Sequence, residues 1–227
     1  MILFNHSNNS VSIVSATNQS LTCPISKVTT KYRRELFKTT ASTTTIVLTS
    51  AKVFDIYLLN TNATSGTVQV SSSGLSTENF TLDLTVTGGF DSVLSNNTLN
   101  SLDTHIKTEF VHSNATVTIT LNHATESEIT LGMIMCGVSL KSGVVTQDGA
   151  NFRNDKDEST ANVNMNITQY YEIKQYLYEN RSEFFVFMPF RTNSSLKDRN
   201  ILYGQVSLSG AKFINNAEVD TTVKIKE

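Results

Sequence analysis

Hydrophobic and polar residues alternate with a period of two along much of the first 140 positions. The pattern is clearest in residues 80–87, where every second residue is Phe, Leu or Val and the residues between are Thr or Asp. Residues 115–122 repeat it, and there Val117, Ile119 and Leu121 form the apolar side. A period of two predicts antiparallel strands with one buried face and one solvated face.

Further segments of the same half have the length and composition of strands, and Asn-, Ser- and Gly-rich stretches separate them. The expected strands are residues 44–49, 53–60, 66–71, 104–112 and 128–140. The residues between them tolerate left-handed or side-chain-capped turns. Short strands at this spacing predict a β-sandwich.

The pattern changes after Leu140, where turn-like and charged stretches follow one another. Residues 168–180 are the one segment with helical spacing, and Thr168 is placed to cap the helix at its N-terminus. The apolar face of this helix consists of Tyr170, Ile173 and Leu177. Three more strands are expected at residues 183–190, 201–209 and 221–226. We therefore predict a sandwich domain in residues 1–141 and a smaller α+β domain with one helix in residues 142–227.

Composition supports a sheet-rich chain and limits its partners. The 227 residues include 31 Thr, 26 Ser and 22 Asn, and only 17% are charged. Thr is β-branched and suits a pleated, half-exposed surface. The 18 Lys and Arg against 20 Asp and Glu give no broad positive field, so nucleic acid is not expected as the main partner.

The chain shows no signal for export or membrane insertion. Its start turns polar after Phe4, which leaves too short an apolar run for a signal peptide. No window approaches the roughly 18 apolar residues of a membrane span. We therefore expect synthesis in the cytoplasm.

No catalytic, cofactor-binding or metal-binding pattern stands out. His105 and His112 are an odd number of positions apart, so on one strand they point to opposite faces and do not converge on a metal with His123. The chain has no Gly-x-Ser-x-Gly elbow and no glycine-rich phosphate cradle. The acidic residues 148–158 lack the spacing of a calcium loop. The expectation is a protein that is not an enzyme and has no cofactor.

Two features leave alternatives open. Cys23 and Cys136 are either a free thiol and a small buried hydrophobe, or partners in a disulfide. Ten Asn-x-Ser/Thr sequons occur, which fits a secreted adhesive glycoprotein. Without a signal peptide, we interpret the sequons as a consequence of the Asn-, Ser- and Thr-rich composition.

The order of several segments resembles a group of tailed-bacteriophage virion proteins. The first half of the resemblance is the basic and aromatic segment Lys31-Tyr-Arg-Arg-Glu-Leu-Phe-Lys-Thr-Thr40, the strand Phe54-Asp-Ile-Tyr-Leu-Leu-Asn-Thr-Asn62 and the hairpin segment Gly66-Thr-Val-Gln-Val70. The second half is Leu131-Gly-Met-Ile-Met-Cys-Gly137, the tyrosine-bearing helix, Ile201-Leu-Tyr-Gly204 and the terminal Lys224-Ile-Lys-Glu227. The family often has Trp in the basic and aromatic segment, where this chain has Tyr32 and Phe37.

This resemblance implies a fold and a role. Such proteins begin with a jelly-roll-like, discoidin-like or galactose-binding-like sandwich and work as repeated copies in a ring. The resemblance therefore implies a non-enzymatic structural component of a virion, in the tail or tail junction, whose partners are other virion proteins and copies of itself. The alternative is a carbohydrate-binding module for host attachment. The secreted adhesive glycoprotein is a further alternative.

An assembly role places function in exposed loops and sheet edges, which neighbouring copies can cover. Arg next to an aromatic residue can meet a sugar, a phosphate or a partner carboxylate. Three segments are therefore expected at subunit contacts: the basic cluster, the loop of residues 60–66 and the charged loop of residues 153–158. The candidate residues are Lys31, Tyr32, Arg33, Arg34, Asn60, Asn62, Arg153, Asp155 and Asp157.

Overall fold

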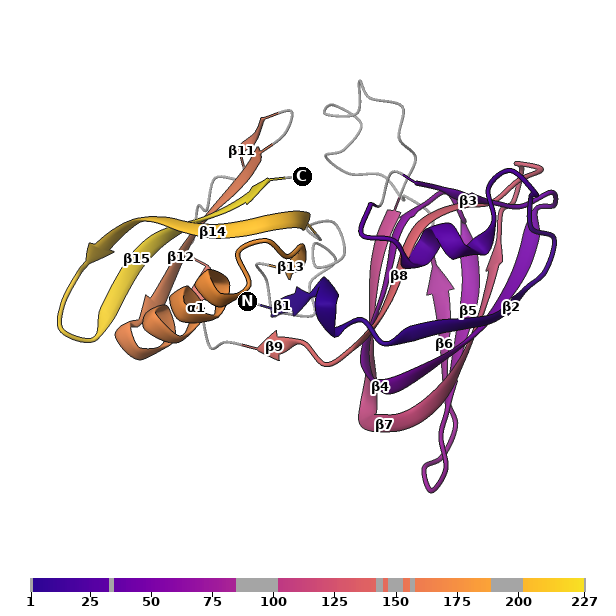
Figure 1. Ribbon diagram of the computed structural model, residues 1–227, viewed down its shortest axis with the longest axis horizontal. Helices are drawn as coiled ribbons and strands as arrows, with labels where there is room; N and C mark the ends of the chain where they lie inside the picture. Colours follow the sequence, from indigo (N-terminus) through magenta and orange to yellow (C-terminus); the bar gives the residue numbers. More distant parts are fainter. Residues whose placement is uncertain are drawn as a thin grey trace. The chain divides into compact units, whose positions relative to one another are not determined.

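The computed structural model divides the chain into two compact units (Figure 1). One unit is Asn9–Val138, and the other combines Met1–Asn8 with Ser139–Glu227. The structure describes residues 2–32, 35–84, 102–141, 145–146, 153–155, 158–188 and 202–226. No helix in these ranges is long and apolar enough to cross a membrane.

The unit Asn9–Val138, which we call the sandwich unit, is built from antiparallel strands. Their order is β3-β8-β4-β7-β5-β6, and β2 pairs with β4 beside this path. The strands are β2 (Val11–Ala16), β3 (Phe37–Lys38), β4 (Thr43–Thr61), β5 (Ser65–Ser71), β6 (Glu78–Asp83), β7 (Leu102–Asn122) and β8 (Thr130–Gly137). A short 3-10 helix, η2 (Ile25–Thr29), lies between β2 and β3 in the sequence.

Two long strands run through both layers of the sandwich. Residues 43–50 of β4 pair with β2 and with residues 115–122 of β7, whereas residues 55–61 pair with β8 and with residues 102–107 of β7. Each long strand therefore contributes one half to each layer. The prediction of a mainly β, antiparallel sandwich in a chain with one helix is confirmed.

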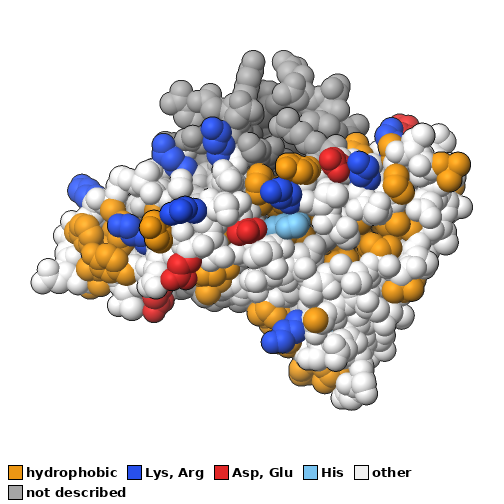
Figure 2. Space-filling model, viewed as in Figure 1, with side chains coloured by type: hydrophobic (Ala, Val, Ile, Leu, Met, Phe, Trp, Pro, Cys, Tyr) orange, Lys and Arg blue, Asp and Glu red, His pale blue; other side chains and the backbone are white. Residues whose placement is uncertain are grey.

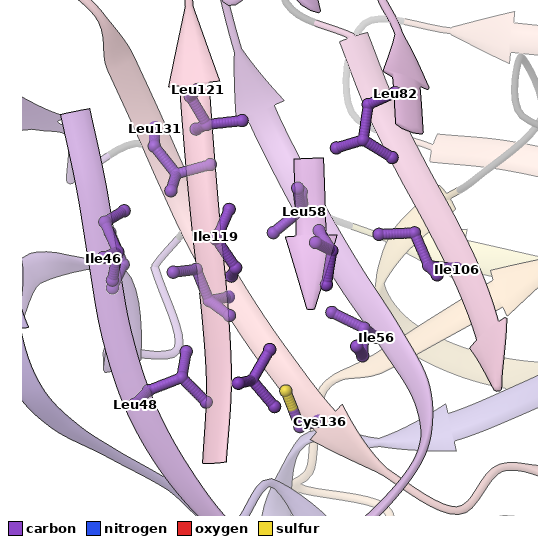
Figure 3. Close-up of a cluster of buried hydrophobic side chains, with 14 of the residues drawn as sticks. Ile46, Leu48, Ile56, Leu58, Leu82, Ile106, Ile119, Leu121, Leu131 and Cys136 are labelled. Carbon is purple, nitrogen blue, oxygen red and sulfur yellow. The ribbon is translucent and has the colours of Figure 1, made fainter. Parts of the chain in front are cut away.

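The core of the sandwich unit lies between these layers (Figure 3). One layer contributes Ile46, Leu48 and Ile119, and the other contributes Ile56 and Leu58, all with no exposed surface. Ile119 lies between Thr118 and Thr120, as a period of two predicts, whereas Ile56 and Leu58 have the buried neighbours Tyr57 and Leu59. Burial of each such side chain contributes about 1.5–3 kcal/mol, so this core is the main source of stability for the unit.

The long strands differ from the sequence prediction, which divides each of them in two. Segments 44–49 and 53–60 lie in the single strand β4, and segments 104–112 and 115–122 lie in β7. The pairing of β4 with β7 continues in register through the residues between the segments, with Ser50↔Ala115 and Lys52↔Ser113 in place of turns. Asn114 takes a left-handed conformation with φ of 47°, which Asn tolerates better than most residues and which lets the strand bend without breaking.

The other unit, which we call the helical unit, has an eight-stranded sheet in the order β10-β12-β15-β14-β13-β1-β9, with β11 paired to β12. Its strands are β1 (Ile2–Asn5), β9 (Leu140–Lys141), β10 (Val145–Thr146), β11 (Arg153–Asp155), β12 (Glu158–Asn166), β13 (Phe185–Met188), β14 (Leu202–Phe213) and β15 (Glu218–Lys226). A 3-10 turn, η1 (His6–Asn8), follows β1.

Strand β1 lies in the sheet of the helical unit. The sequence pattern instead predicted a sandwich domain that includes all of residues 1–141. It pairs with β13 from Ile2↔Met188 to Asn5↔Phe185, and on its other side with β9. Its apolar run of four residues is too short to show a period, so the pattern alone does not reveal its partner. The apolar residues of β13 provide that partner.

The single helix α1 (Ile167–Glu179) packs on β12, β14 and β15. Its buried residues are Tyr170, Ile173 and Leu177, the apolar face that the sequence predicts. The predicted cap at Thr168 is wrong, because Asn166 fills that role. The side-chain oxygen of Asn166 accepts a hydrogen bond from the Gln169 N–H at 2.8 Å, which satisfies one of the free donors of the first turn.

Candidate functional site

The basic cluster predicted from the sequence lies on the surface just after η2. Tyr32 is 54% exposed, and the Lys31 Nζ atom lies 5.6 Å from the centroid of its ring. Lys27 and Glu35 form an ion pair at 3.4 Å on either side of this segment. Arg33 and Arg34 lie outside the described residues. The exposed aromatic and its cation stay candidates for a contact.

The predicted loop of residues 60–66 is shorter than expected, and one of its candidates is used internally. The Asn62 side chain donates to the Glu128 carbonyl at 3.1 Å and accepts from the Thr130 N–H at 2.7 Å. It thereby fixes the end of β4 to the start of β8. Asn60 has a left-handed φ of 59°, which turns the chain there.

The predicted charged loop begins as a strand. Arg153 and Asp155 belong to β11, which pairs with β12 from Arg153↔Thr160 to Asp155↔Glu158. Asp157 lies outside the described residues. Polarity alone predicted a loop here, but backbone pairing with the long strand β12 overrides the low strand propensity of Asp and Asn.

A second cluster, which the sequence analysis missed, surrounds an irregularity in β7. The register passes from Val53↔His112 to Asp55↔Lys107, so residues 108–111 bulge out opposite the single residue Phe54. The bulge leaves Phe110 and Val111 at 45% and 47% exposure. Backbone groups in this bulge lose their ladder partners and need other ones.

Glu78 of β6 supplies those partners. Its carboxylate accepts from the N–H groups of Glu109 and Phe110 at 2.8 and 3.3 Å, and from Nε2 of His112 at 2.8 Å. Burial raises the pKa of the Glu78 carboxyl, but the donors Glu109 N–H, His112 and Phe110 N–H together hold the pKa below its ordinary value of 4.5. The carboxylate therefore stays ionised and holds the bulge.

The ring of His112 connects Glu78 to Ser72. Because a carboxylate only accepts, Nε2 is the donor, and in a neutral ring Nδ1 accepts from the Ser72 hydroxyl at 2.8 Å. This Ser–His–Glu chain has the connectivity of a hydrolase triad, but the His112 side chain is fully buried. We interpret it as a support for the bulge. The three residues come from separate segments, so no local motif reveals them.

The other buried histidine has a different partner. His105 Nε2 lies 2.8 Å from Asp55 Oδ1, and its ring stacks on Tyr57 at a centroid distance of 4.7 Å. In the parts of the chain that the structure describes, no three His, Cys, Asp or Glu side chains gather closely enough to hold a metal ion.

Both cysteines are free thiols in the structure. Cys136 belongs to the core of the sandwich unit, whereas Cys23 is only partly buried. Burial raises the pKa of the Cys136 thiol well above its ordinary value, because a thiolate would lose its hydration there. Cys136 thus packs as a small hydrophobe.

A groove of about 540 Å³ on the surface of the sandwich unit lies along β2 and the nearby η2, and we call it the edge groove. It is lined by all six residues of β2 and by Gln19, Ile25, Ser26 and Thr29, none of which is charged. On the inner side Val11, Ile13 and Ala16 pack against the core.

Strand β2 is also an edge of its layer. Among the described strands it pairs with β4 alone, so its other backbone edge has no described strand beside it. The register shifts between Ile13 and Ser15, which leaves the bulged Val14 62% exposed. This edge strand has no Lys, Pro or inward charge to prevent pairing with another chain, and the bulge at Val14 is the feature that limits such pairing.

Neither protein-family models nor curated protein sequences match this chain. Solved structures show some likeness. A chain in the crystal structure of reduced XRCC1 bound to the DNA pol beta catalytic domain is 16% identical, with a TM-score of 0.40, over 56% of this chain and 96% of that one. CBM32-3 from a family 31 glycoside hydrolase of Clostridium perfringens is 10% identical, with a TM-score of 0.40, over 60% and 95%.

CBM32-1 from the same enzyme is 12% identical, with a TM-score of 0.39, over 59% of this chain and 99% of that one. Likeness at this level does not assign the chain to a family or a function.

Proposed function

We propose that the chain is a non-enzymatic structural component of a tailed-bacteriophage virion, in the tail or tail junction, that acts through contacts between repeated copies. The order of segments that resembles such virion proteins supports the particular assembly. The open, uncharged edge of β2 supports the mode of action, and it is the observation on which the proposal depends.

The chemistry of the edge groove defines what fits it. A free strand edge offers alternating N–H and C=O groups, and an extended segment of another chain satisfies both by adding a strand. The groove provides Val14 and Ile25 for apolar contacts and no charge that would need a counterion. The partner is therefore an extended, uncharged segment of another copy of the chain.

The irregularity at Val14 makes this edge selective. A straight partner strand pairs with one part of β2 and then loses register, because two residues of β2 stand opposite one residue of β4. A partner with a matching bend pairs along the whole strand. This difference separates a specific contact from general aggregation.

The proposal is tested by a charge at the edge. Val14→Lys places an ammonium group on an exposed position, so the fold tolerates it, but strand addition would bury the charge without a partner. Such burial costs several kcal/mol, so the association constant should fall by more than about a hundredfold. Sedimentation velocity of the purified chain across a range of concentrations measures it.

Thr116→Lys is the matched control. Thr116 lies in β7 and pairs with Thr49 of β4, which in turn pairs with Ser12 of β2. It is therefore on the same sheet as β2 but away from the edge. Thr116 is exposed, so Thr116→Lys adds the same charge as Val14→Lys but places it outside the edge groove. Equal association of the two variants, or a wild-type chain that remains monomeric throughout, would contradict the proposal. A portal, terminase or tail-tube gene beside the gene for this chain is also expected.

A further inference from the structure

A second groove lies in the helical unit, between α1 and the strands β14 and β15. Its volume is about 400 Å³, and we call it the cationic groove. The described residues that line it are Lys174, Leu177, Tyr178, Arg181, Gln205, Val206, Ser207, Leu208, Lys224 and Lys226. Four are cationic and none is acidic. Figure 2 shows several Lys and Arg side chains over this unit.

Three of the four cations of this groove have no acidic partner within the described residues. Lys174, Arg181 and Lys226 form no ion pair there. Like charges at a concave surface repel one another, and their fields add in the hollow between them. An anion placed in the groove removes that repulsion and satisfies the donors.

Two of the cations are held by aromatic rings. The Arg181 guanidinium carbon lies 5.4 Å from the centroid of the Tyr178 ring, and Lys174 Nζ lies 5.5 Å from that of Tyr170. Such cation–π contacts limit the side-chain conformations before any ligand binds. Tyr178 is itself 69% exposed, so much of the ring is free to contact a ligand at the rim of the groove.

The remaining lining adds the other features of a sugar site. Leu177, Val206 and Leu208 supply an apolar floor, and the Gln205 amide and Ser207 hydroxyl can bond to hydroxyl groups. An aromatic face at the rim suits the apolar face of a sugar ring. Cations in a fixed arrangement bind carboxylate or sulfate groups by charge-assisted hydrogen bonds.

We propose that the cationic groove binds an acidic saccharide, whose carboxylate or sulfate groups meet Lys174, Arg181 and the two lysines of β15. A groove of this volume accommodates a few sugar units rather than a nucleic acid duplex. This inference does not depend on the edge groove, because the residues come from another part of the chain.

Calorimetric titration of the full chain with a chondroitin sulfate tetrasaccharide tests the inference. That probe carries both carboxylate and sulfate groups, and chitotetraose serves as the neutral probe. We expect binding of the first and none of the second. Arg181→Gln and Lys174→Gln should each weaken binding by at least about tenfold, because each removes a charge-assisted hydrogen bond.

Lys212→Gln is the matched control, since Lys212 is an exposed cation of β14 that does not line the groove. It should change the affinity less than about twofold, and circular dichroism confirms that all variants fold. Several results would overturn the inference: no binding of the tetrasaccharide, equal binding of chitotetraose, or equal weakening by all three variants. Equal or tighter binding of a hexaglutamate peptide or a hexathymidylate would also overturn it, since the groove would then recognise charge alone.

Discussion

The edge groove and the cationic groove are both shallow surfaces beside β-strands, but their linings differ completely. The ten described residues that line the edge groove carry no charge, and among the described strands β2 pairs with β4 alone. The cationic groove has four Lys and Arg side chains, and its strands β14 and β15 are paired with each other. The edge groove is suited to the backbone of an extended segment, and the cationic groove is suited to an anion.

The difference shows how one chain can separate two kinds of recognition. Strand addition depends on directional hydrogen bonds over short distances, so it tolerates salt and requires matching register. Binding to clustered cations depends on fields that extend over about 10 Å and are screened by salt. Changes to one surface should therefore leave the other unaffected, and the following predictions test that separation.

Reversing the charge of the cationic groove should have the largest effect. With both Lys174→Glu and Arg181→Glu, carboxylates face the acidic groups of the saccharide, and binding of the chondroitin sulfate tetrasaccharide should fall by more than about a hundredfold. Calorimetric titration measures the loss. The sedimentation profile should match that of the wild type, and altered self-association would show that the grooves are not separate.

Removal of the carboxylate that holds the β7 bulge should destabilise the sandwich unit. Glu78→Ala leaves the N–H groups of Glu109 and Phe110 and the ring of His112 without their acceptor, at a cost of about 1–3 kcal/mol in the free energy of unfolding. Urea denaturation measures it. Asn79→Ala removes an exposed hydrogen bond from the same strand and should cost less than about 0.5 kcal/mol. Equal losses would show that the bulge needs no support.

Salt should distinguish the two grooves without any mutation. Raising the NaCl concentration from about 0.05 to about 0.5 M shortens the screening length severalfold, so saccharide binding should weaken by about tenfold. Self-association through β2 should change less than about twofold, because the edge groove has no charged lining. Titration and sedimentation in the same buffers measure both. A saccharide affinity that does not depend on salt would contradict the charge-based account.

Acid should have the smallest effect, through the Glu78 carboxylate of the sandwich unit. The Glu78 pKa lies below its ordinary value of 4.5 in the folded state, so its carboxylate contributes stability at pH above 4.5. That contribution is lost as the pH falls through the lower, folded pKa. The Glu78→Gln variant lacks this carboxylate. The midpoint of its unfolding transition should therefore depend less on pH than that of the wild type between neutral and acid conditions. If the unfolding midpoints of the wild type and the variant change with pH in the same way, the stabilising role of the Glu78 carboxylate is contradicted.

The sequence predicts the strands better than it predicts the sites. Alternation identifies the inward residues Val117, Ile119 and Leu121, because the period of a strand is visible locally. The helix face at Tyr170 and Ile173 follows from the helical spacing in the same way. Strand continuity through both layers is not predictable, since β4 and β7 stay paired through Ser50 and Ser113, where polar residues indicated a turn.

The candidate sites depend on contacts between distant segments. Glu78, His112 and Ser72 meet only after β6 and β7 have paired with their neighbours. The cationic groove likewise combines segments separated by many residues, such as α1 with β15. Asn62 shows the opposite. Its place in a polar loop suggested an exposed residue, but its side chain accepts a hydrogen bond from the start of β8. Charge and polarity along the chain therefore indicate surfaces, while topology decides which surfaces form a site.

Electron cryomicroscopy of the assembled particle tests the central claim most directly. The account predicts that the outer edge of β2 pairs with an extended strand from a neighbouring chain, with Val14 buried in that contact. A reconstruction in which β2 faces solvent in every copy of the chain would contradict it.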